Sequence, residues 1–453
     1  MNLNKIMEKL ICRLIIADMK ESMDPSQFAN QPGVSVQHYL IKMLDRILSA
    51  MDDNVKGESV AVVASLIDWA KAFPRLDATL GIKSFIDNGV RPSLIPIITS
   101  FFEKRRMRVK WHGQLSSVRN LPGGGPMGST FGIIGYLSQS NDNANCVPEE
   151  DRYKYMDDLT MLEIVSLSNI GIATHNLKQN IPSNIPLHNQ IVPNHHLKSQ
   201  YYLNNIAEWT KNKQMVLNER KSKSMIFNFS KRHQFTTNLK LKGETLEVLN
   251  EAKLLGTIIS TDLKWDKNTE KIVKHANSRM KMLHVGAKFI SNNQDLVYLY
   301  KTFIRSVLEF SSVVWHSSLS KSNISDIERI QKSAVKVILK DRYVNYKKAL
   351  SDLNLEPLSK RREKLCLKFA KESLKLQNFK QMFPLSKKLH CMKQRKGRKY
   401  VQNYANTERY RKSSIPYMQR LLNEEDNMIK SISYASELCQ DPDSITIENL
   451  NYL

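Results

Sequence analysis

A continuous apolar run in the first third of the chain ends directly on an aspartate. Val60–Ile67 contains apolar residues and one serine, and Asp68 follows. Such a run, without the alternation of a half-exposed strand, is typical of a short strand buried on both faces. An ionised carboxylate is costly to bury unless a cation or another partner compensates it. The run therefore predicts a buried strand that ends at a compensated charge.

A second acidic feature lies near residue 157. Asp157 and Asp158 have aromatic and apolar neighbours, within a hairpin expected over residues 153–162. Adjacent carboxylates repel each other, and a divalent metal ion is one reason to keep them together. With Asp68 they could hold two Mg²⁺ ions for phosphoryl transfer, which depends mainly on charge stabilisation. The alternative is an Asp–Asp pair that merely caps or solvates a turn.

The net charge of +24 is unevenly distributed. Residues 1–150 carry 17 basic and 15 acidic side chains, whereas residues 151–453 carry 51 and 29. Residues 371–420 alone carry 14 basic and 2 acidic side chains. This asymmetry favours a nucleic-acid partner, and the alternative is a solubilising basic surface.

Several protein classes are not indicated. The chain has no apolar run of eighteen residues and no signal-peptide pattern, so we expect an intracellular protein, in the nucleus or cytoplasm, without a membrane partner. Its five cysteines are scattered singly, and no Cys/His spacing suits zinc. The oligomeric state is not indicated.

The pattern of apolar residues predicts an α+β region followed by helices. We expect helices over 4–16, 36–51, 79–103 (broken near Arg91-Pro92), 129–138 and 199–213, strands over 106–111, 115–119, 223–229, 238–249 and 254–260, a surface insertion over 165–198, and helices from about 266 onward. In the strand over 106–111, basic and apolar residues alternate before a turn at His112-Gly113.

Five motifs in order resemble those of the reverse transcriptases of non-long-terminal-repeat (LINE-type, jockey-like) retrotransposons. They are Ile67–Phe73, Gly124–Ser129, Tyr155–Asp158, Leu217–Lys223 and Lys253–Gly256. The resemblance implies a right-hand polymerase, with partial fingers over 1–58, a palm over 59–262 that includes the insertion, a helical thumb over 263–350 and a basic helical C-terminal extension over 351–453.

The resemblance also implies roles for single residues. Asp68, Asp157 and Asp158 would be the catalytic metal ligands, and Lys221 would protonate the leaving pyrophosphate. The nucleotide would contact Phe73, Gly125, Pro126, Met127, Gly128 and Tyr155, and the primer grip would be Leu254, Leu255 and Gly256. Phe73 would exclude a 2′-hydroxyl. The alternatives are a core role for Phe73 and a solvated helix-end lysine at Lys221.

Three departures from the family pattern bear on activity. Met127 stands where the family has glutamine and lacks its hydrogen-bond donor, and Pro74 replaces a common aspartate. The chain starts shortly before Gln27-Phe28-Ala29, so finger strands expected upstream are absent and the resemblance implies an N-terminally truncated polymerase.

The leading hypothesis is an RNA-directed DNA polymerase that uses two Mg²⁺ ions, with Mn²⁺ as an alternative, and binds an RNA template, a DNA primer and dNTPs. A second is a catalytically inactive retroelement remnant that binds RNA through its basic C-terminal half, including the cluster Lys393–Lys399. An RNA-templated RNA polymerase is a third, against which Phe73 argues. Arg106, Arg108 and Lys110 could contact a nucleic-acid backbone or form a solvated strand face.

Overall fold

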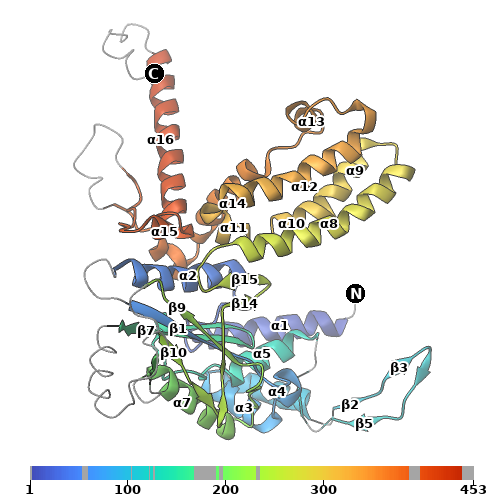
Figure 1. Cartoon of the computed structure of the whole chain (residues 1–453). Helices are drawn as coiled ribbons and strands as arrows, with labels where there is room; N and C mark the ends of the chain where they lie inside the picture. Colours follow the sequence, from blue (N-terminus) through green and yellow to red (C-terminus); the bar gives the residue numbers. More distant parts are fainter. Residues whose placement is uncertain are drawn as a thin grey trace. The chain divides into compact units, whose positions relative to one another are not determined.

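The computed structural model describes residues 3–53, 60–103, 105–121, 123–125, 128–167, 190–192, 197–230, 235–386 and 398–440. The chain divides into two compact units, Met1–Leu255 and Gly256–Leu453, which are described separately below (Figure 1). Unit 1 contains a central sheet with helices, and the described part of unit 2 is largely helical. The predicted α+β class is confirmed.

A five-stranded sheet forms the centre of unit 1, in the order β13-β9-β1-β7-β6. Its strands are β1 (Val60–Ile67), β6 (Arg152–Tyr155), β7 (Asp158–Ser166), β9 (Lys223–Phe227) and β13 (Glu247–Leu249). β1 is antiparallel to both β7 and β9, whereas β13 is parallel to β9. The apolar run is thus the middle strand, as its composition predicts.

Both faces of β1 are covered because its side chains alternate between them. Val63 and Ile67 join a buried core that includes Tyr136 of α5 (Thr130–Gln139). On the opposite face lies α2 (Val36–Asp52), where the hydroxyl of Tyr39 donates a hydrogen bond of 2.7 Å to Thr160 Oγ1 of β7.

The remaining helices of unit 1 are α1 (Leu3–Met19), α3 (Ala78–Asp87), α4 (Ile95–Phe102) and α7 (Lys198–Asn212). Helices α1, α3, α4 and α5 share a second apolar core. α3 begins at Asp77, whose carboxylate accepts a hydrogen bond of 2.8 Å from the Leu80 N–H. The predicted break near Arg91-Pro92 is confirmed by a 3₁₀ turn over Pro92–Leu94.

The predicted continuous strand over 238–249 is wrong. It forms three short strands, β11 (Lys240–Leu241), β12 (Glu244–Thr245) and β13. Lys242 and Gly243, with φ of 49° and 91°, form a tight turn between the first two. Strand β8 (Gln190–Val192) pairs in parallel with β10 (Phe235–Thr237). Most of the expected insertion, residues 168–189 and 193–196, lies outside the described residues.

In unit 2, helix α8 packs against α12, and Leu283 and Ile330 are among the buried apolar residues of these helices. Unit 1 ends with β14 (Glu251–Leu254), and unit 2 begins with β15 (Thr257–Ser260). The helices are α8 (Asp266–Phe289), α9 (Asn293–Leu299), a π-helical turn (Tyr300–Arg305), α10 (Ser306–Leu308), α11 (Ser312–Trp315), α12 (Lys321–Leu339), α13 (Tyr346–Asp352), α14 (Leu358–Ser373), α15 (Glu408–Arg411) and α16 (Ser414–Gln440).

The expectation of helices from about residue 266 onward is wrong for the described residues between α14 and α15. After α14, the chain forms a 3₁₀ turn (Gln377–Met382) and an irregular segment until α15. Pro384 lacks the N–H that a continuing helix needs, and buried side chains such as Phe379 and Phe383 fix the segment without a helix. Among the described helices, none combines the length and apolar character needed to cross a lipid bilayer.

Candidate active site

The strand register brings the three predicted aspartates to the same end of two neighbouring strands. β1 and β7 pair antiparallel, and the last pair is Ile67 with Leu159. Asp68 follows β1 directly, and Asp158 is the first residue of β7, so they come next in this register. Asp157 lies one residue further, in the turn. Residues 89 positions apart therefore converge because the apolar strand is paired in this register and not in another.

The turn between β6 and β7 is tight. Tyr155 pairs with Asp158, which leaves Met156 and Asp157 as the two turn residues. Met156 has a φ of 56°, a left-handed conformation that costs a non-glycine residue about 1–3 kcal/mol. Backbone strain of this kind occurs often at functional sites. The turn leaves Asp157 exposed and Asp158 partly buried.

The electrostatics show that the three carboxylates affect one another. Burial, and then the charges of Asp157 and Asp68, raise the pKa of Asp158 to about 6. Burial and the charge of Asp157 also raise the pKa of Asp68, against the opposing effects of Lys221 and Asn218. Ionising all three groups is therefore unfavourable without a nearby cation.

The turn after α7 fixes the backbone at Asp68. The N–H of Asn218 donates a hydrogen bond of 2.8 Å to the Asp68 carbonyl, and the Asp68 N–H donates one of 3.1 Å to Ser222 Oγ. Asn218 also hydrogen-bonds the Asp68 carboxylate with its side chain. Lys221 is exposed, and its charge acts on Asp68. Asn218 and Ser222 are site residues that were not singled out from the sequence, although both lie inside the motif Leu217–Lys223.

Gln27 supports the aspartate turn from a distant part of the chain. Its side-chain Oε1 accepts hydrogen bonds from the N–H groups of Met156, at 3.1 Å, and Ala29, at 3.0 Å. The side chain is buried, at 4% exposure. A buried acceptor that holds the N–H of a strained turn residue limits how far the turn can move.

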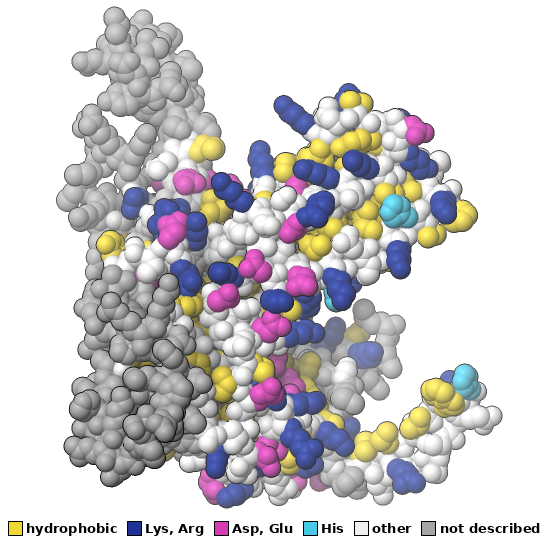
Figure 2. Space-filling view, viewed as in Figure 1, with side chains coloured by type: hydrophobic (Ala, Val, Ile, Leu, Met, Phe, Trp, Pro, Cys, Tyr) yellow, Lys and Arg dark blue, Asp and Glu magenta, His cyan; other side chains and the backbone are white. Residues whose placement is uncertain are grey.

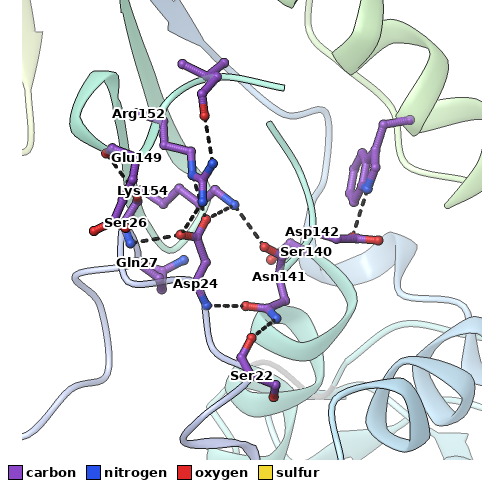
Figure 3. Close-up of polar contacts among 12 residues, drawn as sticks. Ser22, Asp24, Ser26, Gln27, Ser140, Asn141, Asp142, Glu149, Arg152 and Lys154 are labelled. Carbon is purple, nitrogen blue, oxygen red and sulfur yellow. Dashed lines mark hydrogen bonds and ion pairs between the residues drawn. The ribbon is translucent and has the colours of Figure 1, made fainter. Parts of the chain in front are cut away.

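A buried ionic cluster lies beside the same hairpin (Figure 3). Asp24 accepts hydrogen bonds from Arg152, at 2.9 and 3.1 Å, and forms an ion pair of 2.5 Å with Lys154 Nζ. Lys154 Nζ also donates to the Asn141 carbonyl, at 3.0 Å. Burial alone would raise the pKa of Asp24, but its basic partners outweigh burial and lower that pKa. Because both cations belong to β6, the cluster ties this strand to the loop after α1.

The ring of Phe73 makes a core contact, and its backbone contacts the glycine-rich segment. Its ring packs against Tyr136, with centroids 5.0 Å apart, and the residue is partly buried. The Gly125 N–H donates a hydrogen bond of 2.8 Å to the Phe73 carbonyl. A Cβ on Gly125 would lie 2.6 Å from a methyl carbon of Leu76, so a larger residue here would require the Leu76 side chain to shift. Pro74 is in the first turn of a 3₁₀ helix, where its missing N–H leaves no bond unmade.

The other residues predicted to contact the nucleotide or the primer differ in exposure and in backbone conformation. Gly128 is exposed with a φ of 88°, whereas Pro126 and Met127 lie outside the described residues. Tyr155 is partly buried, and its ring meets Tyr39 edge-on at 6.4 Å. The predicted primer-grip residues Leu254, Leu255 and Gly256 form the junction between the two units; Leu255 and Gly256 have φ of 46° and 87°.

The donor set is suited to Mg²⁺, although the side chains are not gathered into a finished metal site. Mg²⁺ prefers carboxylate oxygens, which all three aspartates supply. Among the described residues, no group of three or more His, Cys, Asp or Glu side chains is arranged to hold a metal ion. Burial and mutual repulsion raise the pKa values of Asp68 and Asp158, so a cation bound at this position would favour their ionised forms.

Comparison with solved structures gives weak likenesses. Apo telomerase from Candida tropicalis matches with a TM-score of 0.37 and 13% identity, over 80% of this chain and 53% of that chain. Telomerase from Candida albicans in complex with a TWJ fragment of telomeric RNA matches with a TM-score of 0.33 and 11% identity, over 82% and 57%. No family model matches the chain.

Three curated proteins from Drosophila melanogaster are similar to the chain in sequence. They are the probable RNA-directed DNA polymerases from transposon X-element (21% identical over 345 residues) and transposon BS (22% over 346), and the RNA-directed DNA polymerase from mobile element jockey (24% over 349). Each match covers 74% of this chain and 34–35% of the relative, so the chain spans about a third of the relatives' length. Over 74% of its length this chain is therefore similar in sequence to RNA-directed DNA polymerases of retrotransposons, and the resemblance found in its motifs is confirmed.

Proposed function

We propose that the chain is an RNA-directed DNA polymerase that transfers deoxynucleotides to a primer 3′-hydroxyl at Asp68, Asp157 and Asp158. The register of β1 and β7 carries the proposal, because it aligns Asp68 with Asp158 and leaves Asp157 in the adjoining turn. The curated relatives, which are named RNA-directed DNA polymerases, support the choice of reaction. Unit 1 would supply the palm with partial fingers, and the helices of unit 2 would supply the thumb and the C-terminal extension.

Two Mg²⁺ ions, when bound by the three carboxylates, would lower the pKa of the primer 3′-hydroxyl and neutralise the departing pyrophosphate. The carboxylates have the right chemistry and lie at the ends of adjacent strands, and binding a shared cation would require their side chains to come closer together. Asn218 and Lys221 act on the Asp68 carboxylate and would orient it toward the cation. Lys221 is exposed and could donate a proton to the leaving group.

Phe73 would select deoxynucleotides. Its packing against Tyr136 holds the ring from one side, while its partial exposure leaves the rest of the side chain open to a substrate. The core role and the selective role are therefore compatible in one residue. A rigid ring close to the sugar would clash with a 2′-hydroxyl, which argues against an RNA polymerase.

The proposal is tested by primer extension with the purified chain. We expect it to extend a DNA primer on an RNA template with dNTPs and Mg²⁺, and to incorporate rNTPs much less efficiently. Equal use of dNTPs and rNTPs would favour an RNA polymerase instead. No incorporation with either, at RNA and Mg²⁺ concentrations that saturate binding, would contradict the proposed function.

The alternative of an inactive RNA-binding remnant is favoured by the charge of residues 151–453. It predicts salt-dependent RNA binding without incorporation. Deleting residues 371–420 would remove buried side chains such as Phe383 and Tyr410, so charge substitution is the cleaner test. Replacing Lys393, Arg395, Lys396 and Arg398 with glutamine should then weaken RNA binding strongly, and unchanged affinity would count against this alternative.

A further inference from the structure

A β-hairpin projects from unit 1 between α4 and α5, over residues 105–121, and is called the arm below (Figure 1). It is built from β2 (Arg106–Met107), β3 (Lys110–Trp111), β4 (Gln114–Leu115) and β5 (Arg119–Asn120). His112 and Gly113, both with positive φ, make the tight turn at its tip, as predicted from the sequence. Each side has about eight residues, which at ~3.3 Å per residue gives a reach of roughly 25 Å.

The arm combines exposed apolar side chains with uncompensated positive charge. Residues 106–120 are all exposed, and Trp111 is 72% and Val109 57% exposed. The arm contains five Arg and Lys residues and no acidic residue. In the part of the chain that the structure describes, no ion pair involves these five residues. Figure 2 shows hydrophobic and basic side chains along the arm and no acidic one.

An isolated two-stranded hairpin with this composition is unusual in a stable monomer. Two strands alone are marginally stable, and an exposed apolar face normally has a partner. Five cations without an acidic residue favour a negatively charged partner over a basic one. Alternating cations and an exposed indole suit single-stranded nucleic acid, in which phosphates bind the cations and unpaired bases stack on aromatic rings.

The base of the arm is fixed beside the candidate active site. Arg105 donates a hydrogen bond to the Gly124 carbonyl, and the Leu121 N–H donates one of 2.8 Å to the Arg105 carbonyl. The Gly124 N–H in turn donates to the Leu76 carbonyl, at 2.7 Å, next to the Gly125–Phe73 contact. A strand bound along the arm would therefore lead toward Phe73 and the aspartates.

We infer that the arm binds single-stranded nucleic acid, with Trp111 stacking on a base and Arg106, Arg108 and Lys110 contacting phosphates. Trp111 and the three basic residues alternate along one strand and so lie on opposite faces. Because the ribbon is only two strands wide, the long basic side chains can reach around its edge. Binding of single-stranded nucleic acid by the arm does not depend on the proposed function. That the bound nucleic acid is the template on its way to the active site does rest on the proposed function.

The test measures binding of the full chain to fluorescein-labelled dT and rU oligomers of fifteen nucleotides, in EDTA and without nucleotides. We expect Trp111→Ala to weaken binding by about 5- to 100-fold and Trp111→Phe to retain most of it, since stacking needs an aromatic ring. Replacing Arg106, Arg108 and Lys110 together with glutamine should reduce the slope of log affinity against log salt by about 2, at about 0.7 per lost phosphate contact.

Trp111 also provides a direct signal. Of the five tryptophans, Trp111 alone is strongly exposed; Trp69, Trp265 and Trp315 are buried and Trp209 is partly buried. Quenching of tryptophan fluorescence by the oligomer should therefore be largely lost in Trp111→Phe. Quenching that persists unchanged in this variant would show that the base stacks elsewhere and would overturn the inference.

A matched control replaces three exposed lysines of unit 1 with glutamine: Lys9 of α1, Lys20 just after α1 and Lys83 of α3. This control should leave the salt slope nearly unchanged, and an equal reduction would overturn the assignment to the arm. A second binding measurement uses phosphatidylserine vesicles in place of the oligomers. If the arm variants lose vesicle binding but keep oligomer binding, the partner is a membrane surface and the inference is wrong.

Failure of the arm inference and failure of the proposed polymerase function would give different results. Binding in EDTA does not require the aspartates, so an inactive chain can still bind through the arm. Conversely, polymerase activity with unaltered oligomer binding in the Trp111→Ala and triple variants would reject the arm and retain the active site.

Discussion

Gln27 Oε1 accepts a hydrogen bond from the backbone N–H of Met156, across 129 residues of sequence. The contact joins the loop after α1 to the turn that carries Asp157. Because Met156 has a left-handed backbone, the turn is held in a conformation that it would adopt less readily alone. The position of two proposed metal ligands thus depends on a residue that is not itself charged.

Replacing Gln27 with leucine should loosen this turn. The variant leaves the buried N–H of Ala29 and the partly buried N–H of Met156 without their acceptor, at a cost of about 1–3 kcal/mol in the free energy of unfolding. Gln27→Glu keeps an acceptor oxygen. Hydrogen exchange at the Met156 amide should therefore be slower in Gln27→Glu than in Gln27→Leu. Amide hydrogen exchange at Met156 measures both, and equal exchange in wild type and Gln27→Leu would refute the positioning role.

Asp158 should destabilise the metal-free protein near neutral pH. Its folded-state pKa of about 6 lies above that of the unfolded chain, so its contribution to stability is fully present below about pH 4 and is lost as the pH rises through 6. Asp158→Asn should therefore stabilise the metal-free protein at about pH 8, by about 1 kcal/mol after allowance for partial exposure, and not at about pH 4.

Urea unfolding in EDTA at the two pH values checks this. Asp87→Asn, at an exposed position on α3, is the matched control and should show no such gain. A gain of the same size at both pH values would mean that the asparagine stabilises for another reason.

Mg²⁺ should stabilise the folded wild-type chain. Binding at ten times the dissociation constant contributes about 1.4 kcal/mol, provided that the unfolded chain does not bind the ion. Thermal unfolding with and without Mg²⁺ should show this shift in wild type and in Asp87→Asn, and little or none in Asp68→Asn. A shift that survives in Asp68→Asn would place the ion elsewhere.

Phe73 should control the choice between dNTPs and rNTPs. Phe73→Val removes the ring and should raise the ratio of rNTP to dNTP efficiency at least tenfold, or about 1.4 kcal/mol in discrimination. Phe73→Tyr keeps the ring and should retain the wild-type ratio. Because Phe73 also packs on Tyr136, the ratio is the informative measurement, since a packing defect alone lowers both efficiencies.

The sequence predicted those parts of the fold that depend on local pattern. The apolar run of β1, the Tyr155–Leu159 hairpin and the His112-Gly113 turn each carry a signal within a few residues. The strand expected over 238–249 is interrupted because Lys242-Gly243 forms a left-handed turn. The helices expected from about residue 266 onward are interrupted between α14 and α15, where burial of Phe383 and its neighbours, and not charge or periodicity, determines the conformation.

The residues that support the site through long-range contacts could not be predicted from local sequence patterns. Asp24 pairs with Arg152 and Lys154 across more than a hundred residues, and no local pattern marks an aspartate in a loop as their partner. Asn218 lay inside a motif, but its hydrogen bonds with Asp68 depend on the packing of β9 beside β1. Such contacts follow from the register of the sheet, which tertiary packing determines.

The most direct test is incorporation of a single dNTP by the full chain in one turnover, on an RNA template with a DNA primer and Mg²⁺. Wild type should add the nucleotide, whereas Asp157→Asn, with unchanged thermal stability in EDTA and unchanged RNA affinity, should not add it at a measurable rate. Equal rates for the two proteins would contradict the assignment of the reaction to Asp68, Asp157 and Asp158.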